Sequence, residues 1–168
     1  MTSMEARFGT TTQTVPLPNP WNLTAYLAAV AAHRGRSISV RTAPKAMLTE
    51  LGCRVGGLWI ARAHDDIIVY DAEAADRAAE HIVLHVVGHM LLGHRGDHEN
   101  NDDTERLSSS LSGLLPSLSI HNVKQVLGRN EFGADPERDA EVFADMTLVY
   151  ATLPRRRSRS FRLFGRGK

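Results

Sequence analysis

The sequence predicts an α+β fold, in which a small antiparallel or mixed sheet is followed by a helical half. Two observations carry this prediction. Residues 37–41, 57–63 and 66–70 are rich in β-branched and aromatic side chains, whereas from residue 76 onward the apolar side chains recur with a period near 3.6. A chain of 168 residues that is 42% hydrophobic and 23% charged fits one globular domain and excludes wholesale disorder.

The N-terminal part divides into a lead-in and a helix. We expect residues 1–19 to be mobile or extended, because prolines at alternate positions toward their end oppose regular structure. Asn19 can cap a helix with a proline at its first position, and helical spacing then continues to His33. Gly35 is expected to end that helix.

The β-rich part follows directly. Residues 37–41 alternate and predict a strand, and residues 44–52 predict a short helix that ends at a glycine. The runs 57–63 and 66–70 are separated by a short polar turn, which is typical of a hairpin. Their side chains suit a sheet that is buried on one face.

The second half is predicted to be helical. A wide apolar face over residues 76–92 predicts a largely buried helix that stops at Gly93. Further helices are expected over 102–116 and, in a short piece, over 120–127. The last helix is expected to begin with Asp135 as its N-cap and to end at Pro154.

The net charge of +1 hides two unlike regions. Residues 155–168 hold seven of the 20 Lys and Arg residues and none of the 19 acidic residues. The rest of the chain is therefore acidic. The single cysteine, Cys53, excludes an internal disulfide framework and a thiolate-rich metal site. No apolar run reaches the length of a membrane span, and no secretory signal is visible, so we expect a cytoplasmic protein that does not enter membranes.

Five of the eight histidines fall between residues 81 and 98, and two of these form the most informative pair. His85 and His89 lie four residues apart on a predicted helix, which places both imidazoles on one face. Two such rings can share one metal ion, as in the zinc motif H-E-x-x-H. An H-x-x-x-H pair alone is a weak signal, because two buried histidines can also simply hydrogen-bond in a core.

The surrounding residues strengthen the metal interpretation. Residues 80–94 (EHIVLHVVGHMLLGH) resemble the active helix of the ImmA/IrrE family of metallopeptidases, typically His-Glu-x-x/Gly-His followed by Leu-Leu. The hairpin of residues 57–60 and 66–70 and the segment 137–144 resemble the family's flanking elements. The resemblance covers roughly residues 22–152 and is closest to small actinobacterial members. We therefore expect a metallopeptidase-like domain over residues 20–153.

The resemblance implies zinc as the cofactor and a third ligand, a carboxylate on the last helix. Glu137, Glu141 and Asp139 are the candidates. At 100° per residue, Glu137 lies about 50° from the centre of the helix's apolar stripe, Glu141 about 90° and Asp139 about 110°. This favours His85, His89 and Glu137 as the metal ligands, with Glu141 or Asp139 as alternatives. Glu137 also suits a helix N-terminus for electrostatic reasons alone.

The sequence differs from the family's motif at the position of the general base. The family's motif has a glutamate directly after the first histidine, and its carboxylate takes a proton from the attacking water. That position is Val86 here, which can neither accept nor donate a proton. No residue is therefore predicted to be catalytic, unless an acid between 97 and 105 substitutes. Because a general base contributes about 10²- to 10⁴-fold in rate, we expect a pseudoenzyme that binds zinc with weak or absent peptidase activity.

The resemblance also implies a partner. Members act with helix-turn-helix repressors, so a role in transcriptional regulation is expected. The alternative is a non-enzymatic binding module, or a toxin-antitoxin-type component, that sequesters a regulator. A weaker interpretation rests on the basic tail, residues 154–168, whose charges and two phenylalanines suit nucleic acid. The same composition is also typical of a disordered, solubilising terminus.

The remaining histidines are expected to lie outside the metal site. His81 precedes His85 by four residues and should lie at the edge of the site or in solvent, since each such step drifts 40° around the helix. His94 and His98 follow the helix and should lie on the surface as satellite donors at most. The other three are expected at the surface or in turns, namely His33, His64 and His121.

Overall fold

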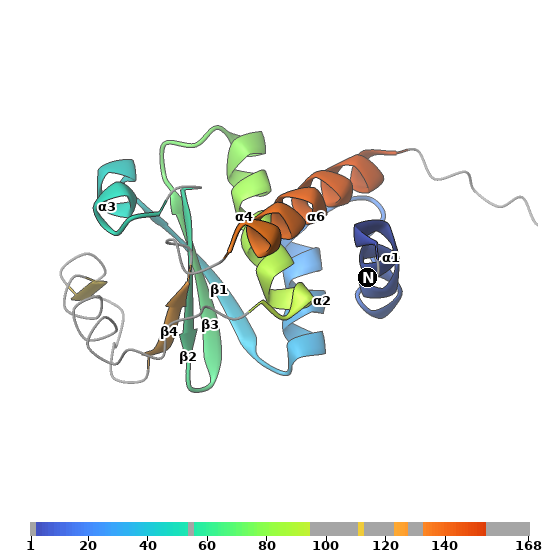
Figure 1. Ribbon diagram of the computed structural model, residues 1–168, viewed down its shortest axis with the longest axis horizontal. Helices are drawn as coiled ribbons and strands as arrows, with labels where there is room; N and C mark the ends of the chain where they lie inside the picture. The colour runs from blue at the N-terminus through green and yellow to red at the C-terminus, as the bar shows by residue number, and fades with distance from the viewer. Residues whose placement is uncertain (1–2, 54–55, 95–110, 113–122, 128–132, 154–168) are drawn as a thin grey trace, which may run out of the picture.

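The computed structural model describes residues 3–53, 56–94, 111–112, 123–127 and 133–153 (Figure 1). It confirms the α+β class. The elements, in chain order, are α1 (Met4–Thr14), α2 (Leu23–Arg34), β1 (Ser37–Ala43), α3 (Lys45–Glu50), β2 (Gly57–Arg62), β3 (Asp65–Asp71), α4 (Asp76–Leu92), β4 (Val123–Leu127) and α6 (Ala134–Thr152). Within the described ranges, no helix is long and apolar enough to cross a membrane.

The sheet is four-stranded and mixed, with the strand order β1-β3-β2-β4. The predicted hairpin is confirmed, because β2 and β3 pair antiparallel with Trp59 opposite Ile68. β1 lies parallel to β3, and β4 lies antiparallel to β2. The central strands β2 and β3 therefore have neighbours on both sides, and these two strands hold most of the buried positions of the sheet.

Both faces of the sheet are covered, whereas the sequence predicted a sheet buried on one face. Trp59 and Ile68 point to the large core formed with α1, α2, α4 and α6. Their neighbours along the two strands point to a second core with α3, because successive side chains of a strand alternate between faces. Figure 1 shows these layers, with α3 on one side of the sheet and α2, α4 and α6 on the other.

Helix α4 is the central element of the helical layer. It packs on α6 and on the sheet, and two glycines allow the close contact. A Cβ at Gly57, the first residue of β2, would lie 2.6 Å from Ile82 Cγ2. A Cβ at Gly88 would lie 3.2 Å from the Cα and carbonyl oxygen of Ala140 in α6. The helix ends as predicted at Gly93, whose φ of 71° is left-handed.

Buried polar contacts tie α2, the sheet and α4 together at Asp66, which is fully buried at the start of β3. Its carboxylate accepts hydrogen bonds from Arg34 Nη2 at 2.9 Å, Arg36 Nε at 3.2 Å and the Trp59 indole at 3.0 Å. Arg34 also donates to the carbonyl oxygen of Met90 at 3.1 Å. One carboxylate thus fixes the end of α2 against α4.

The expectation of a mobile or extended lead-in over residues 1–19 is wrong for residues 4–14, which form α1. Ser3 caps this helix by accepting a hydrogen bond from the Ala6 amide, and the prolines all follow its end. Phe8 is its buried anchor and meets the ring of Phe143 edge-on at 5.4 Å. Arg7 binds Asp139 of α6. Because only Phe8 is buried in this helix, the periodic signal was too weak to predict it.

Three further expectations change in detail. Residues 123–127 form strand β4, not the end of a short helix, because they pair with β2. Asn22 caps α2 in place of Asn19, and Gly133 caps α6 in place of Asp135. The helix expected over 102–116 lies outside the described residues except at Leu111 and Ser112, which are helical. The basic tail, 154–168, lies outside them as well.

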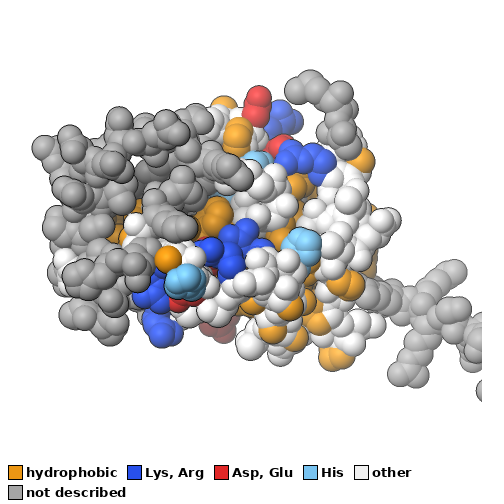
Figure 2. Space-filling model, turned by 90° about the horizontal axis from the view of Figure 1, so that it is seen from below, with side chains coloured by type: hydrophobic (Ala, Val, Ile, Leu, Met, Phe, Trp, Pro, Cys, Tyr) orange, Lys and Arg blue, Asp and Glu red, His pale blue; other side chains and the backbone are white. Residues whose placement is uncertain are grey.

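Figure 2 shows one face of the molecule, on which polar side chains and backbone separate small groups of hydrophobic side chains. Large apolar side chains are strongly exposed at the C-terminal end of α6, at Val149, Tyr150 and Leu153.

Candidate metal centre

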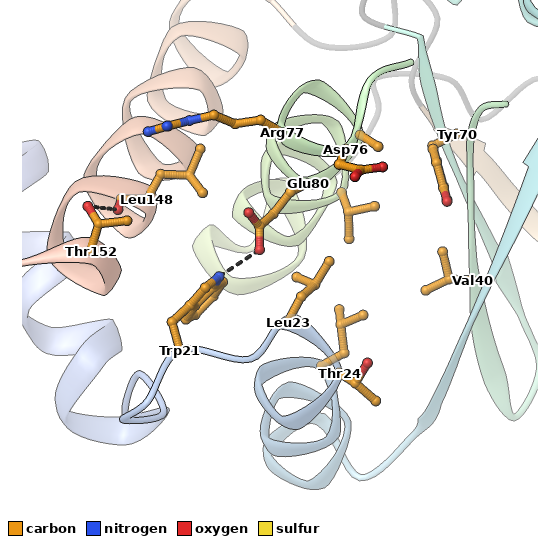
Figure 3. A pocket seen from close by; sticks show the side chains of 13 residues that line it. Trp21, Leu23, Thr24, Val40, Tyr70, Asp76, Arg77, Glu80, Leu148 and Thr152 are labelled. Atoms are coloured by element: carbon orange, nitrogen blue, oxygen red, sulfur yellow. Dashed lines mark hydrogen bonds between the residues drawn. The ribbon is translucent and has the colours of Figure 1, made fainter. Parts of the chain in front are cut away.

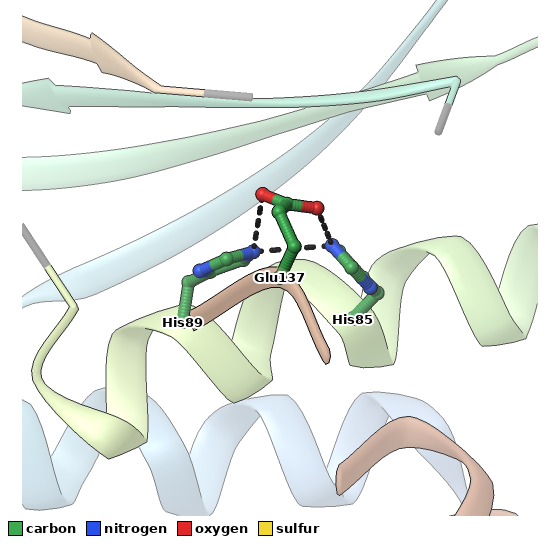
Figure 4. A group of neighbouring side chains, drawn as sticks. All are labelled: His85, His89 and Glu137. Atoms are coloured by element: carbon green, nitrogen blue, oxygen red, sulfur yellow. Dashed lines mark hydrogen bonds and ion pairs between the residues drawn. The ribbon is translucent and has the colours of Figure 1, made fainter. Parts of the chain in front are cut away.

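The structure brings together the three residues that the sequence predicts as metal ligands. His85 and His89 lie on α4 and are 5% and 3% exposed, and Glu137 lies in the first turn of α6. The Nε2 atoms of the two histidines are 3.1 Å apart. Each is also 3.3 Å from a carboxylate oxygen of Glu137 (Figure 4). Within the described residues, these three side chains form a group with metal-ligating atoms, in which the two histidines are buried and Glu137 is half-buried.

The donor atoms of the three residues lie at distances close to those between ligands of one zinc ion. Nitrogen and oxygen ligands lie about 2.0–2.2 Å from zinc, so two ligands at tetrahedral angles are separated by about 3.3–3.6 Å. The two nitrogens are 3.1 Å apart, and each lies 3.3 Å from a different oxygen of Glu137, so each separation is close to that edge length. Three protein ligands leave a fourth position for water or substrate, which is the composition of a catalytic zinc site.

The other ring nitrogens of the two histidines also have partners. His85 Nδ1 lies 3.1 Å from Glu141 Oε2, and His89 Nδ1 lies 3.1 Å from His94 Nδ1. A histidine that donates its Nδ1 proton to a carboxylate presents the Nε2 lone pair to a metal. Glu141 therefore orients His85 toward the centre without itself joining the group of three.

The histidines of α4 and the acidic residues of α6 form two rows of side chains that face each other. His81, His85 and His89 recur every four residues along α4, and Glu137, Glu141 and Asp145 recur every four residues along α6. His81 Nε2 lies 3.5 Å from Glu141 Oε1 and 3.1 Å from Asp145 Oδ1. Because α4 and α6 run antiparallel here, the rows stay in register and the histidine row becomes more exposed toward His81.

The electrostatics of the site favour the protonation states that a metal requires. Burial raises the pKa of Glu137, but its contacts with the imidazoles of His85 and His89 outweigh burial and lower it to about 2. Burial lowers the pKa of His89 and, together with the nearby His89 and Arg7, lowers that of His94 to about 4. At neutral pH the centre thus holds a carboxylate and a neutral imidazole at His89, which are the ligand forms.

Val86 occupies the position at which the family's general base would lie. Its side chain is 4% exposed and belongs to the large core. Its Cγ2 atom lies 3.2 Å from the position of a Cβ at Gly57, so Val86 faces the start of β2. The acids between residues 97 and 105, which could substitute for the missing base, lie outside the described residues.

The structure places the other candidates apart from the group of three. Asp139 binds Arg7 of α1, and Glu141 lies behind His85. His81 lies at the edge of the site. His94 is half-buried against His89, not on the open surface as expected.

The other predicted surface histidines divide into two groups. His33 and His64 are exposed, which confirms the prediction. His98 and His121 lie outside the described residues.

Sequence reasoning missed the outer partners, Glu141 behind His85 and His94 behind His89. The signal for the first was available, because Glu137, Glu141 and Asp145 share the four-residue spacing of the histidines. His94 could not be found this way, since it follows the left-handed turn at Gly93.

Comparison with protein-family models, with curated proteins and with solved structures gives no match for this chain. The functional interpretation therefore rests on the residues of the site and on the motif resemblance.

Proposed function

We propose that this chain is a zinc-binding, ImmA/IrrE-like regulatory protein whose peptidase activity is weak or lost. The observation that carries the proposal is the convergence of two buried imidazole nitrogens, 3.1 Å apart, and one carboxylate whose two oxygens each lie 3.3 Å from one of them. The residues after the first histidine supply no base, because Val86 is apolar and buried. The set of His85, His89 and Glu137 thus holds the metal, and the proton-transfer group of a peptidase is missing.

Each part of this centre has a defined role in the proposal. His85, His89 and Glu137 hold the ion, and Glu141 and His94 orient the two imidazoles from behind. When bound, the zinc ion supplies Lewis-acid polarisation of a carbonyl oxygen. Without a positioned base, the rate falls by about 10²- to 10⁴-fold relative to an intact site.

The partner in this proposal is a helix-turn-helix repressor, which the motif resemblance implies, and the setting is the cytoplasm. The single cysteine is consistent with a reducing compartment. The protein would then regulate its repressor by binding it at or near the metal centre, with little cleavage.

A non-enzymatic binding module is the second candidate. The specific observation in its favour is that the histidine and carboxylate rows already pair with each other along α4 and α6. In that case the rows hold the two helices together and the chain sequesters its partner without zinc.

Metal analysis separates the two candidates. The chain is purified with zinc present and exchanged into metal-free buffer, and its zinc content is measured by mass spectrometry. We expect about one zinc per chain in the wild type and in His81→Ala, a matched histidine variant outside the group of three, and little in His89→Ala. Wild-type zinc content in His89→Ala, or none in the wild type, would overturn the proposal.

The role of Val86 is tested by restoring the acid. We expect Val86→Glu to raise cleavage of a co-expressed helix-turn-helix repressor by about 10²-fold or more. Val86→Gln, whose side chain has the shape of glutamate but no carboxylate, should not raise it. Circular dichroism of both variants verifies that a polar side chain at this buried position leaves the fold intact. A wild type that already cleaves as fast as Val86→Glu would contradict the assignment.

A further inference from the structure

A cavity of about 620 Å³ lies beside α4 (Figure 3). Asp76 lines this cavity, and His85 follows it by about two and a half helical turns, so the two side chains leave α4 in opposite directions. The walls come from α2, α4, β1, β3 and the C-terminal end of α6. The cavity shares no residue with the metal centre, and its volume is within the range of small-molecule sites.

The walls of the cavity are mostly apolar. Aliphatic side chains from α2, β1, α4 and α6 provide this surface, namely Leu23, Leu27, Val40, Val83 and Leu148. Two aromatic side chains, Trp21 and Tyr70, complete it. Such a lining takes up an apolar body of modest size, and the few polar groups decide its orientation.

Two carboxylates, Asp76 and Glu80, line the cavity together with the hydroxyl groups of Thr24 and Thr152. Glu80 Oε1 accepts a hydrogen bond of 2.6 Å from the Trp21 indole, which holds the ring and the acid together at the wall. Asp76 lies one turn earlier on the same face of α4. Within the described part of the chain, neither acid forms an ion pair. Arg77 also lines the cavity, but Figure 3 shows its side chain extending toward α6 and away from Tyr70.

We propose that this cavity binds a small organic cation, an ammonium group carried on an aromatic or branched aliphatic body. Carboxylates accept strong hydrogen bonds from ammonium groups, and the faces of Trp and Tyr attract cations. The aliphatic walls bury the body of such a ligand. A carboxylate ligand of the same shape is rejected, because it would lie beside Asp76 and Glu80.

The probes for the test are 2-phenylethylammonium, the neutral 2-phenylethanol and the anionic phenylacetate. Binding is followed by the two indole N–H signals in NMR spectra of the full chain. Trp21 reports on the cavity, and Trp59 is the internal reference because its indole is bound to the buried Asp66. We expect 2-phenylethylammonium to shift the Trp21 signal saturably with a Kd of about 0.1–1 mM. The Trp59 signal should not move.

Two variants make the test specific. Glu80→Gln and Asp76→Asn should each weaken 2-phenylethylammonium about tenfold, by the loss of one charge-assisted contact. Glu50→Gln, at the exposed end of α3, should leave it unchanged. The Trp59 signal shows whether each variant is folded. The proposal is overturned if no saturable shift occurs up to about ten times that Kd, or if phenylacetate or 2-phenylethanol binds as tightly as the amine.

Discussion

At the scale of single residues, the buried carboxylate of Asp66 joins the end of α2 to the sheet. It is fully buried and receives hydrogen bonds from Arg34, Arg36 and Trp59. Removing it leaves two partly buried guanidinium groups without their main partner. Because an unpaired buried charge is costly, this residue holds α2, β3 and α4 in place.

We therefore expect Asp66→Ala to lower the free energy of unfolding by about 3–5 kcal/mol. The neighbouring Asp65→Ala is the matched control. It breaks only a partly exposed pair with Arg62, which is worth less than about 1 kcal/mol. Urea denaturation of both variants measures the difference, and equal losses would contradict the assigned role of Asp66.

Tyr26 presents the opposite case, a buried polar group that lacks a partner. Its ring is fully buried, and its hydroxyl finds no hydrogen-bond partner among the described residues. Burial raises the pKa of this phenol far above its usual value. In the unfolded chain the phenol ionises near pH 10, whereas in the folded chain it stays protonated.

The folded state thus binds a proton that the unfolded state releases above pH 10, so the stability of the wild type falls as the pH rises through that point. We expect Tyr26→Phe to be as stable as the wild type or more stable at pH 8, and to lose less stability between pH 8 and pH 11. Denaturant curves at both pH values test this. A variant with the same pH dependence as the wild type would argue against a buried, unpartnered hydroxyl.

At the scale of elements, the contact between α4 and α6 determines the geometry of the candidate metal centre. The two helices meet at Gly88, where a Cβ would lie 3.2 Å from the backbone of Ala140 and from Phe143 Cδ1. Glu137 lies one turn before Ala140 on α6. The distance between the helix axes therefore sets the distance between Glu137 and the two histidines.

We expect Gly88→Ala to force the helices apart, costing about 1–3 kcal/mol of stability and weakening zinc binding at least about tenfold. Gly9→Ala in α1 is the control, since nothing lies within 4 Å of its added Cβ. That control should gain about 0.5–1 kcal/mol from helix propensity and bind zinc normally. Thermal unfolding and zinc titration of both variants decide the matter, and a neutral Gly88→Ala would refute the close-contact argument.

At the scale of the whole molecule, a bound zinc ion would join two elements that are distant in sequence. Two of its proposed ligands lie on α4 and the third lies on α6. Helix α1 packs on the same pair through Phe8 and Arg7. The helical layer is thus one unit, and its stability should depend on the metal.

We expect zinc at about 100 times its Kd to stabilise the fold by about 2.7 kcal/mol and to raise the Tm by about 5–10 °C. Chelation with EDTA should reverse the shift. Magnesium, which prefers oxygen ligands, should not reproduce it. Differential scanning calorimetry of the wild type and of His89→Ala measures the effect, and an identical zinc shift in both would place the stabilising ion elsewhere.

The sequence by itself determined the local structure and part of the chemistry. Period and glycine stops predicted α4 and its end at Gly93, and alternation predicted the β2–β3 hairpin. The four-residue spacing of His85 and His89 placed two imidazoles on one face of a helix. The sequence alone also shows that valine, and not glutamate, follows the first histidine of the motif, at position 86. These features depend on neighbours within a few residues, which one chain segment contains.

The tertiary structure decided which segments meet. It brought Glu137, rather than Glu141 or Asp139, to the two histidines, a choice that angles on α6 alone could only favour. It made residues 123–127 a strand, because β2 offered an open edge, and it ordered α1 through Phe8 and Arg7. The physical reason is the same in each case. Helix register and strand pairing depend on contacts between residues far apart in the chain, and local periodicity carries no record of them.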